Sequence, residues 1–228
     1  MYPLFVTPVN TYRHSNRADK AQVTRMRILE AARTLFVDQG YAATKIEEIA
    51  REAGVAVQTI YFVFGNKRSV LKELVDVSCS GEDEAVPPLE RAWVRKVAAT
   101  ADAEEQLAMS VRQLRRIHER VSPVLEVLRK AATSDPEIEE LWEHNKRHRL
   151  EVHRHIIGLL SDAGALRPGL SKRRATDIAY GMMSQEMYSL LVNERGWSSG
   201  QWAKWVHGVL SFELLGHALG SGVGSSAY

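Results

Sequence analysis

The feature that most constrains this chain is a pair of short helix patterns, separated by one glycine, within residues 44–62. The first predicted helix opens at Thr44, where Glu47 three positions later completes a capping box, and it ends at Gly54. The second helix follows at once and reaches about Phe62. Two short helices joined by a glycine-containing turn are typical of a helix-turn-helix, which we therefore predict here.

Helical spacing continues along the rest of the chain. Apolar residues recur every three or four positions, whereas the alternating pattern of β-strands is absent. Longer helices are predicted on either side of the pair, over 21–38 and 67–76. Beyond a linker at 79–88, the predicted helices cover 88–99, 102–120, 123–133, 136–162, 171–194 and 199–217. The break near residue 123 is predicted because Pro123 removes a helical hydrogen bond.

An all-α fold follows from this pattern, with an N-terminal three-helix helix-turn-helix domain and a larger helical domain after it. We assign residues 1–20 to a flexible basic arm and residues 21–77 to the helix-turn-helix domain. The second helical domain covers residues 78–219. Residues 220–228 are rich in glycine and serine, which favours a disordered tail.

Charge is distributed unevenly along the chain. Residues 1–77 hold 11 Lys and Arg against 8 Asp and Glu, a net charge of +3, and the remaining residues hold 19 against 20, a net charge of −1. This asymmetry alone is weak evidence for a polyanionic partner. It supports one only because the predicted helix-turn-helix lies in the same positively charged segment.

Cysteine content and hydropathy predict a soluble cytoplasmic protein. The single Cys79 cannot form an internal disulfide, which suits a reducing compartment. No apolar run approaches the roughly 18 to 20 residues that a membrane span needs, and the first residues lack a signal-peptide pattern. We expect no membrane partner.

Residues 25–76 resemble the TetR family of bacterial regulators. The resemblance is carried by Ile28-Leu29-Glu30-Ala31-Ala32, Leu35-Phe36, Gly40-Tyr41, Thr44, Ile46-Glu47-Glu48-Ile49-Ala50, Ala53-Gly54-Val55, Thr59-Ile60-Tyr61, Phe64 and Asn66-Lys67. It implies that the chain is a transcriptional regulator binding an operator in double-stranded DNA. Ala56 departs from the family, which often has Ser or Thr there, so the operator sequence is not predicted.

The second short helix is the element expected to enter the major groove, where its leading residues would meet base edges. An exposed glutamine there can pair with adenine, and small apolar groups can pack on a thymine methyl. The resemblance implies that Tyr61 and Lys67 hold phosphates, and a helix start near Thr44 favours an anion. The predicted DNA-binding residues are Thr44, Lys45, Val57, Gln58, Thr59, Tyr61, Phe62 and Lys67.

The resemblance further implies a homodimer formed by the last two long helices, and hence a pseudo-palindromic operator. The predicted interface residues are Trp202, Trp205, Val209 and Phe212. It also implies a pocket for an unknown small-molecule effector. Candidate lining residues are Trp93, Met109, Trp142, Tyr180, Met183 and Met187, although methionines and aromatics at helical spacing are also typical of plain core.

We favour a ligand-responsive repressor over two other classes of protein. An enzyme is disfavoured because no nucleophile elbow or phosphate-binding loop occurs, and no cofactor is expected. A non-specific architectural DNA-binding protein would need a more basic surface. The row His144, His148 and His155 is a weak metal pattern among cationic neighbours, so no metal site is predicted.

Overall fold

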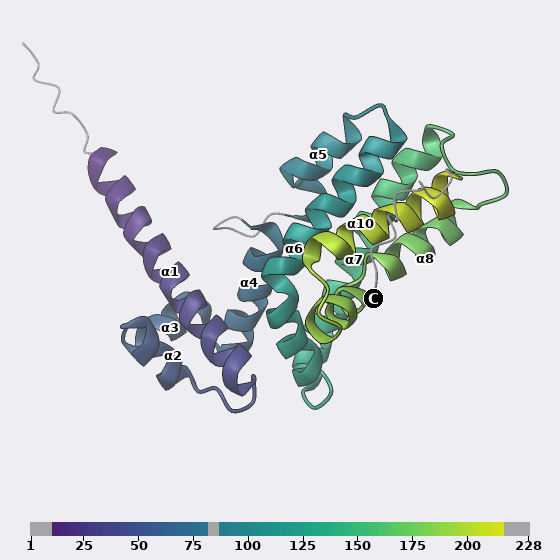
Figure 1. Ribbon diagram of the computed structural model, residues 1–228. Coiled ribbons are helices and arrows are strands. Elements are labelled where there is room, and N and C mark those ends of the chain that lie inside the picture. Colours follow the sequence, from purple (N-terminus) through teal and green to yellow (C-terminus); the bar gives the residue numbers. More distant parts are fainter. Residues whose placement is uncertain (1–10, 82–86, 217–228) are drawn as a thin grey trace, which may run out of the picture. The chain divides into compact units, whose positions relative to one another are not determined.

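The computed structural model describes the backbone of residues 11–81 and 87–216, and side chains from residue 19 onward within those ranges; those parts are helical and contain no strand (Figure 1). The predicted all-α fold class is confirmed. The chain divides into two compact units, Met1–Leu74 and Val75–Tyr228, so the boundary lies three residues before the predicted one. The predicted disordered tail at 220–228 lies outside the described residues. No described helix is long and apolar enough to cross a membrane.

Four helices build the N-terminal unit: α1 Thr11–Gln39, α2 Ile46–Ala53, α3 Val57–Phe64 and the first part of α4 Lys67–Ser80. Their inward faces form one apolar core, in which α1 packs on α2 and α2 on α3. The buried side chains at its centre are Ile28, Leu29, Ala32, Phe36, Ile49, Ala50, Ile60, Val70 and Leu71.

Two predictions for this unit are wrong in position. Residues 11–20 of the predicted arm are helical, because α1 begins at Thr11 and has no proline or glycine to interrupt it; residues 1–10 lie outside the described part. The capping box predicted at Thr44 lies one residue later, since the carboxylate of Glu48 accepts from the backbone amide of Lys45 at 3.0 Å. Thr44 itself is buried.

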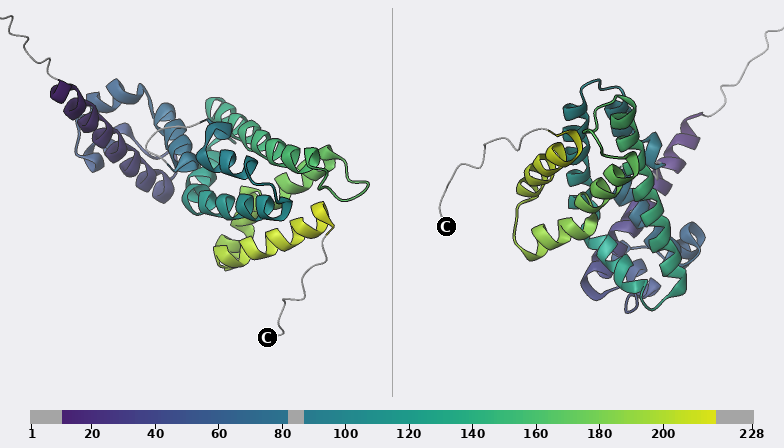
Figure 2. Two further views of the ribbon diagram at one scale, coloured as in Figure 1. Left: turned by 90° about the horizontal axis from the view of Figure 1, so that it is seen from above. Right: turned by 90° about the vertical axis from the view of Figure 1, so that its right-hand side faces the viewer.

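The C-terminal unit contains two long helices, α6 with 29 residues and α7 with 27. Its elements are η1 Pro88–Glu90, α5 Ala92–Ala98, α6 Ala103–Ala131, α7 Pro136–Asp162, α8 Lys172–Met182, α9 Gln185–Tyr188, the π-helical turn η2 Ser189–Glu194, α10 Ser199–Leu210 and the π-helical turn η3 Ser211–Leu215. Within it, α6 contacts α5, α7, α9 and α10, while α8 packs on α7 (Figure 2). α6 is therefore the central helix of this unit.

Two predicted boundaries in the C-terminal unit are also wrong. α6 runs unbroken through Pro123, because buried residues on both sides, such as Val121 and Leu125, hold it in the core. The single helix predicted over 171–194 is interrupted after Met182. There Ser184 begins a new helix by accepting a hydrogen bond from the amide of Met187 at 3.1 Å.

Candidate DNA-binding surface and effector cavity

The turn between α2 and α3 depends on Gly54. Its φ of +63° is left-handed, and a Cβ there would lie 2.8 Å from Nη2 of Arg27. The following amide, that of Val55, donates to the carbonyl oxygen of Ala50 at 2.9 Å. This hydrogen bond closes the end of α2 and directs the chain into α3.

α3 has one buried face and one exposed face. Ile60 is fully buried, whereas Phe62 is 91% exposed and Tyr61 50% exposed. Gln58 is exposed beside them, and Val57 and Thr59 are half-buried. The residues predicted to contact DNA on α3 therefore share an outer surface. Ala56, at the start of α3, supplies no side-chain cap, which agrees with its departure from the family pattern.

Lys67 and Thr44 have structural partners within the unit. The Lys67 ammonium donates to the carbonyl oxygens of Tyr41 at 2.8 Å and Thr44 at 2.9 Å, and it lies 4.3 Å from the centre of the Tyr41 ring. The Thr44 hydroxyl donates to the carbonyl oxygen of Gly40 at 2.8 Å. Thr44 is 1% exposed, so its hydroxyl serves the fold, and the anion contact predicted at this helix start through backbone amides stays a prediction.

The backbone amide at the start of α2 also has a hydrogen-bond partner within the chain. Lys45 is exposed, as a phosphate contact requires, but its backbone amide already donates to Glu48. That hydrogen bond lowers the pKa of the Glu48 carboxyl, which stays ionised. An anion at this helix start would therefore meet the Glu48 carboxylate as well as the Lys45 ammonium.

A cavity of about 70 Å³ lies inside the C-terminal unit. Its apolar wall consists of Pro88, Trp93, Leu114, Ile117, Val121, Leu125, Val152 and Met183. Its polar wall consists of Asp76, Cys79, Arg91, His118, Asn145, His148, Arg149 and His153. Burial raises the pKa of the Cys79 thiol to about 11, so that side chain is neutral.

Two histidines of this cavity are fixed by backbone carbonyls. Nε2 of His118 lies 3.0 Å from the carbonyl oxygen of Met183, and Nδ1 of His153 lies 2.6 Å from that of Arg149. Burial lowers the pKa of each imidazole to about 4, so both are neutral at pH 7. In each ring the nitrogen facing the carbonyl carries the proton, and the other nitrogen is a bare acceptor.

Of the predicted effector residues, only Trp93 and Met183 line this cavity. Trp142 and Tyr180 do not line it, but their ring centres lie 5.2 Å and 5.6 Å from the guanidinium of Arg149, which does. Met109, whose sulfur accepts a hydrogen bond from Thr100, does not line the cavity, and neither does Met187 of α9.

The sequence reasoning missed the polar wall of the cavity. On α7, Asn145, Arg149 and His153 recur every four residues and share a helix face with the buried Val152. A row of polar residues inside an apolar stripe was the signal that could have revealed them.

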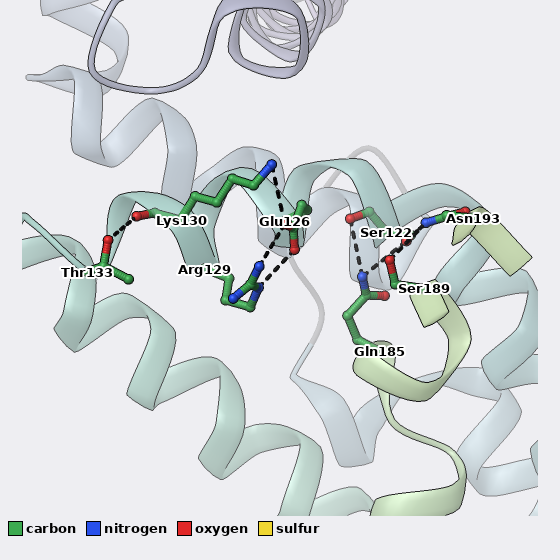
Figure 3. A network of polar contacts seen from close by, with 8 residues as sticks. All are labelled: Ser122, Glu126, Arg129, Lys130, Thr133, Gln185, Ser189 and Asn193. Atoms are coloured by element: carbon green, nitrogen blue, oxygen red, sulfur yellow. Dashed lines mark hydrogen bonds and ion pairs between the residues drawn. The ribbon is translucent and has the colours of Figure 1, made fainter. Parts of the chain in front are cut away.

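A polar network holds α9 and η2 against α6, one turn beyond His118 (Figure 3). The Gln185 side-chain amide donates to the Ser122 hydroxyl, and so does that of Asn193, each at 3.1 Å. Asn193 also donates to the hydroxyl of Ser189. The helix break that supplies the Met183 carbonyl to His118 is thus held by further hydrogen bonds to the same helix.

A wider, open groove of about 940 Å³ lies over α7 and α8. Three acidic and three basic side chains line it: Glu151, Asp162, Asp177, Arg154, Lys172 and Arg173. Because these charges balance, the groove favours neither an anion nor a cation.

The predicted dimer residues divide between core and surface. Trp202 is fully buried in its own unit, where its ring packs edge-on against His118 at 5.5 Å and against Tyr188 at 5.1 Å, so its assignment to an interface is wrong. Trp205 and Phe212 are 37% and 47% exposed, and Val209 is half-buried between them. The apolar surface stripe of α10 and η3 is therefore narrower than predicted.

The histidine row on α7 stays a weak metal pattern. The rings of His144 and His148 lie 4.0 Å apart. Among the described residues, no three His, Cys, Asp or Glu side chains are placed to hold a metal ion together. His148 instead faces the cavity, where burial and the neighbouring His144 lower its pKa.

Comparison with known proteins bears on the helix-turn-helix segment most directly. A family model described as "Bacterial regulatory proteins, tetR family" matches residues 28–74. Over 89 residues, 38% of this chain, the sequence is 38% identical to the HTH-type transcriptional regulator SrpR of Pseudomonas putida. The chain belongs to the TetR family. The matched segment covers 42% of SrpR, less than half of its length.

Solved structures extend the TetR-family likeness to the C-terminal unit as a likeness of fold. FadR from Bacillus subtilis, a transcriptional regulator solved in complex with stearoyl-CoA, has a TM-score of 0.62 at 21% identity and covers 81% of this chain and 96% of its own. NalD of Pseudomonas aeruginosa, described as the secondary repressor of the MexAB-OprM multidrug efflux pump, has a TM-score of 0.64 at 20% identity, covering 86% and 98%. SrpR, FadR and NalD are described as regulators or repressors, not as enzymes.

Proposed function

We propose that this TetR-family chain is a DNA-binding transcriptional regulator that reads the major groove with α3. The observation that carries the proposal is the outer face of α3, where Phe62 is 91% exposed and Gln58 lies beside it, opposite the fully buried Ile60. Leaving a phenylalanine in water forgoes about 1.5–3 kcal/mol of burial free energy, which a partner surface would recover. A duplex is the partner for which this motif is shaped.

Each exposed residue of α3 has a role in this proposal. Gln58 pairs with an adenine edge, and Phe62, Val57 or Thr59 packs on thymine methyl groups. Tyr61 and Lys45 contact phosphates and set the position of the helix on the duplex. Lys67 already donates hydrogen bonds to the turn before α2, and its contact with a phosphate stays a prediction.

The regulator acts as a homodimer on a pseudo-palindromic operator. The exposed stripe on α10 and η3 supports this, because Trp205 and Phe212 lie seven positions apart with Gly208 between them, and a Cβ at Gly208 would meet nothing within 4 Å. A small residue in an apolar stripe allows close approach of a second helix. Two-fold symmetry then places half-sites about 34–36 Å apart, or a multiple of that distance.

An effector bound in the cavity of the C-terminal unit lowers operator affinity, which makes the protein a ligand-responsive repressor. FadR was solved with stearoyl-CoA and NalD is described as a repressor, and both share the fold. In this chain α4 begins at Lys67 in the helix-turn-helix unit and supplies Asp76 and Cys79 to the cavity. On the other side, His118 contacts Trp202 of α10. Such a switch requires different effector affinities for the two states.

The test is selection of bound sites from random duplexes at about 150 mM salt, where non-specific phosphate attraction is weak. The expected result is one shared two-fold motif, and the Gln58→Ala variant should change preference at one position of each half-site. Recovery of no shared motif would contradict the proposal, as would uniform coating of all duplexes, which is the behaviour of an architectural protein.

The dimer has its own test. Phe212→Glu should convert the protein to monomers in sedimentation analysis, since it places a charge in the apolar stripe. Lys204→Glu is the matched control, because it adds the same side chain at an exposed position of α10. If Phe212→Glu stays dimeric, the interface lies elsewhere.

A further inference from the structure

The cavity of the C-terminal unit holds polar atoms that have no hydrogen-bond partner among the described residues. Nδ1 of His118, Nε2 of His153 and Oδ1 of Asn145 are buried and accept no hydrogen bond there, and Nε1 of Trp93 and Nε of Arg149 are buried and donate none. All five residues line the cavity. Buried polar groups in folded proteins are almost always paired, so five in one wall need an explanation.

The unpaired atoms are fixed as acceptors or donors by the surrounding structure. The Met183 and Arg149 carbonyls keep the protons of His118 and His153 on the opposite ring nitrogens. The bare nitrogens therefore require a donor from whatever fills the cavity. The Trp93 indole and the Arg149 guanidinium can only donate, so the same occupant must also accept.

Hydrogen-bonding capacity excludes the simplest ionic ligands. A carboxylate can accept from the Trp93 indole and the Arg149 guanidinium, but it has no proton to donate to the bare nitrogens of the two imidazoles. An ammonium group can donate to the bare nitrogens, but it has no lone pair to accept from the Trp93 indole and the Arg149 guanidinium. A hydroxyl is uncharged and both donates and accepts, so it matches both sets of atoms.

Resting on the proposed function, we infer that the effector is a compact, uncharged, mostly apolar molecule with at least two hydroxyl groups, which donate to His118 and His153. The apolar wall covers its body, and the volume of about 70 Å³ limits the occupant to a small molecule and disfavours a long chain. Its hydroxyl groups replace missing hydrogen bonds in a site shielded from water, where an unmade bond costs most.

The experiment uses the full chain and a matched set of single-ring probes: resorcinol, toluene, benzoate and benzylamine. Calorimetry should show that resorcinol binds at least about tenfold more tightly than toluene, the value of one added hydrogen bond. Benzoate and benzylamine should bind no better than toluene. Equal affinities of toluene and resorcinol would overturn the inference, and so would a preference for either ion.

Variants locate the hydroxyl contacts. His118→Leu and His153→Leu should each lower resorcinol affinity about tenfold and leave toluene binding unchanged. His155→Leu is the control, because His155 lies on α7 outside this cavity. Should His118→Leu fail to fold, ¹⁵N-histidine spectra of the unaltered protein decide. Resorcinol should move the signal of the unprotonated nitrogen of His118, and an unmoved signal contradicts the contact.

Measuring operator binding on the same sample distinguishes a failure of the effector class from a failure of the proposed function. A protein that binds its operator but no hydroxylated probe overturns the effector class and leaves the regulator standing. A protein that selects no operator overturns the proposed function, whatever its cavity binds.

Discussion

The interiors of the two units differ in polarity. Among the described residues, the N-terminal unit buries one polar side chain, Thr44, and its hydroxyl is hydrogen-bonded. The C-terminal unit buries ten: Ser78, Gln106, Ser110, His118, Ser122, Asn145, His153, Thr176, Gln185 and Ser211. The unpartnered buried polar atoms also lie in the C-terminal unit, with none among the described side chains of the N-terminal unit.

This difference suits two kinds of task. A helix that reads DNA needs a fixed backbone, and an apolar, fully paired interior holds α3 in one position. A unit that responds to a ligand needs a conformation that the bound ligand stabilises. Buried acceptors without a partner, such as Nδ1 of His118, allow this because a ligand can donate the hydrogen bond that they lack. Four predictions test this comparison, beginning with the largest effect.

Ile60→Ala should lower the free energy of unfolding of the N-terminal unit by about 2–5 kcal/mol, because it leaves a hole in a fully packed core. Urea denaturation followed by circular dichroism measures the change, and operator binding should weaken with it. Val63→Ala on the same helix is the control, since Val63 is only half-buried. Equal losses of unfolding free energy at Ile60 and Val63 would contradict the packing described for α3.

Acid should destabilise the C-terminal unit through its buried imidazoles. Folding lowers the pKa of His118 and His153 from 6.5 to about 4, so the unfolded chain binds more protons between these values. Stability is therefore full above pH 6.5 and falls as the pH drops toward 4, by at most roughly 3 kcal/mol per imidazole. The charged neighbours Arg149 and Glu186 form an ion pair, and although burial acts to raise the pKa of the Glu186 carboxyl, its hydrogen bond with Arg149 lowers that pKa overall.

The predicted loss of stability in acid is checked by urea denaturation at pH 7 and pH 5. The shift in the urea midpoint between the two pH values is compared for the unaltered protein and His118→Leu. The variant should lose less stability on acidification, because one neutral imidazole has been removed. An identical pH dependence in both proteins would show that His118 does not remain neutral in the folded state.

Lys67→Met should cost about 1–3 kcal/mol, because the carbonyls of Tyr41 and Thr44 lose a charged donor. Its effect on DNA distinguishes two roles. If Lys67 only holds the turn, operator affinity falls while the dependence of affinity on salt concentration is unchanged. If it also contacts a phosphate, the salt slope falls by about one.

Ser122→Ala should have the smallest effect, about 1 kcal/mol, since the amides of Gln185 and Asn193 lose one acceptor. Thermal unfolding measures the loss. Thr133→Ala, on an exposed hydroxyl just beyond the end of α6, is the control and should stay within about 0.5 kcal/mol. A larger effect at Thr133 than at Ser122 would argue against the hydrogen bonds that Ser122 accepts from Gln185 and Asn193 as stabilising contacts (Figure 3).

The same comparison explains what sequence could predict. α3 and α7 were located correctly because a glycine turn and an Asp-Pro start mark them locally. The unbroken α6 and the break after Met182 depend on packing from other helices, which outweighs the local effect of Pro123. The burial of Thr44 and Trp202 was missed for the same reason, since a sequence pattern does not show which face a neighbour covers.

The exposed phenyl ring of Phe62 has a thermodynamic consequence for association. Its hydration shell is released only when another surface covers the ring, and removing apolar surface from water lowers the heat capacity of the system. Operator binding should then become more exothermic with rising temperature, and Phe62→Ser should flatten that trend.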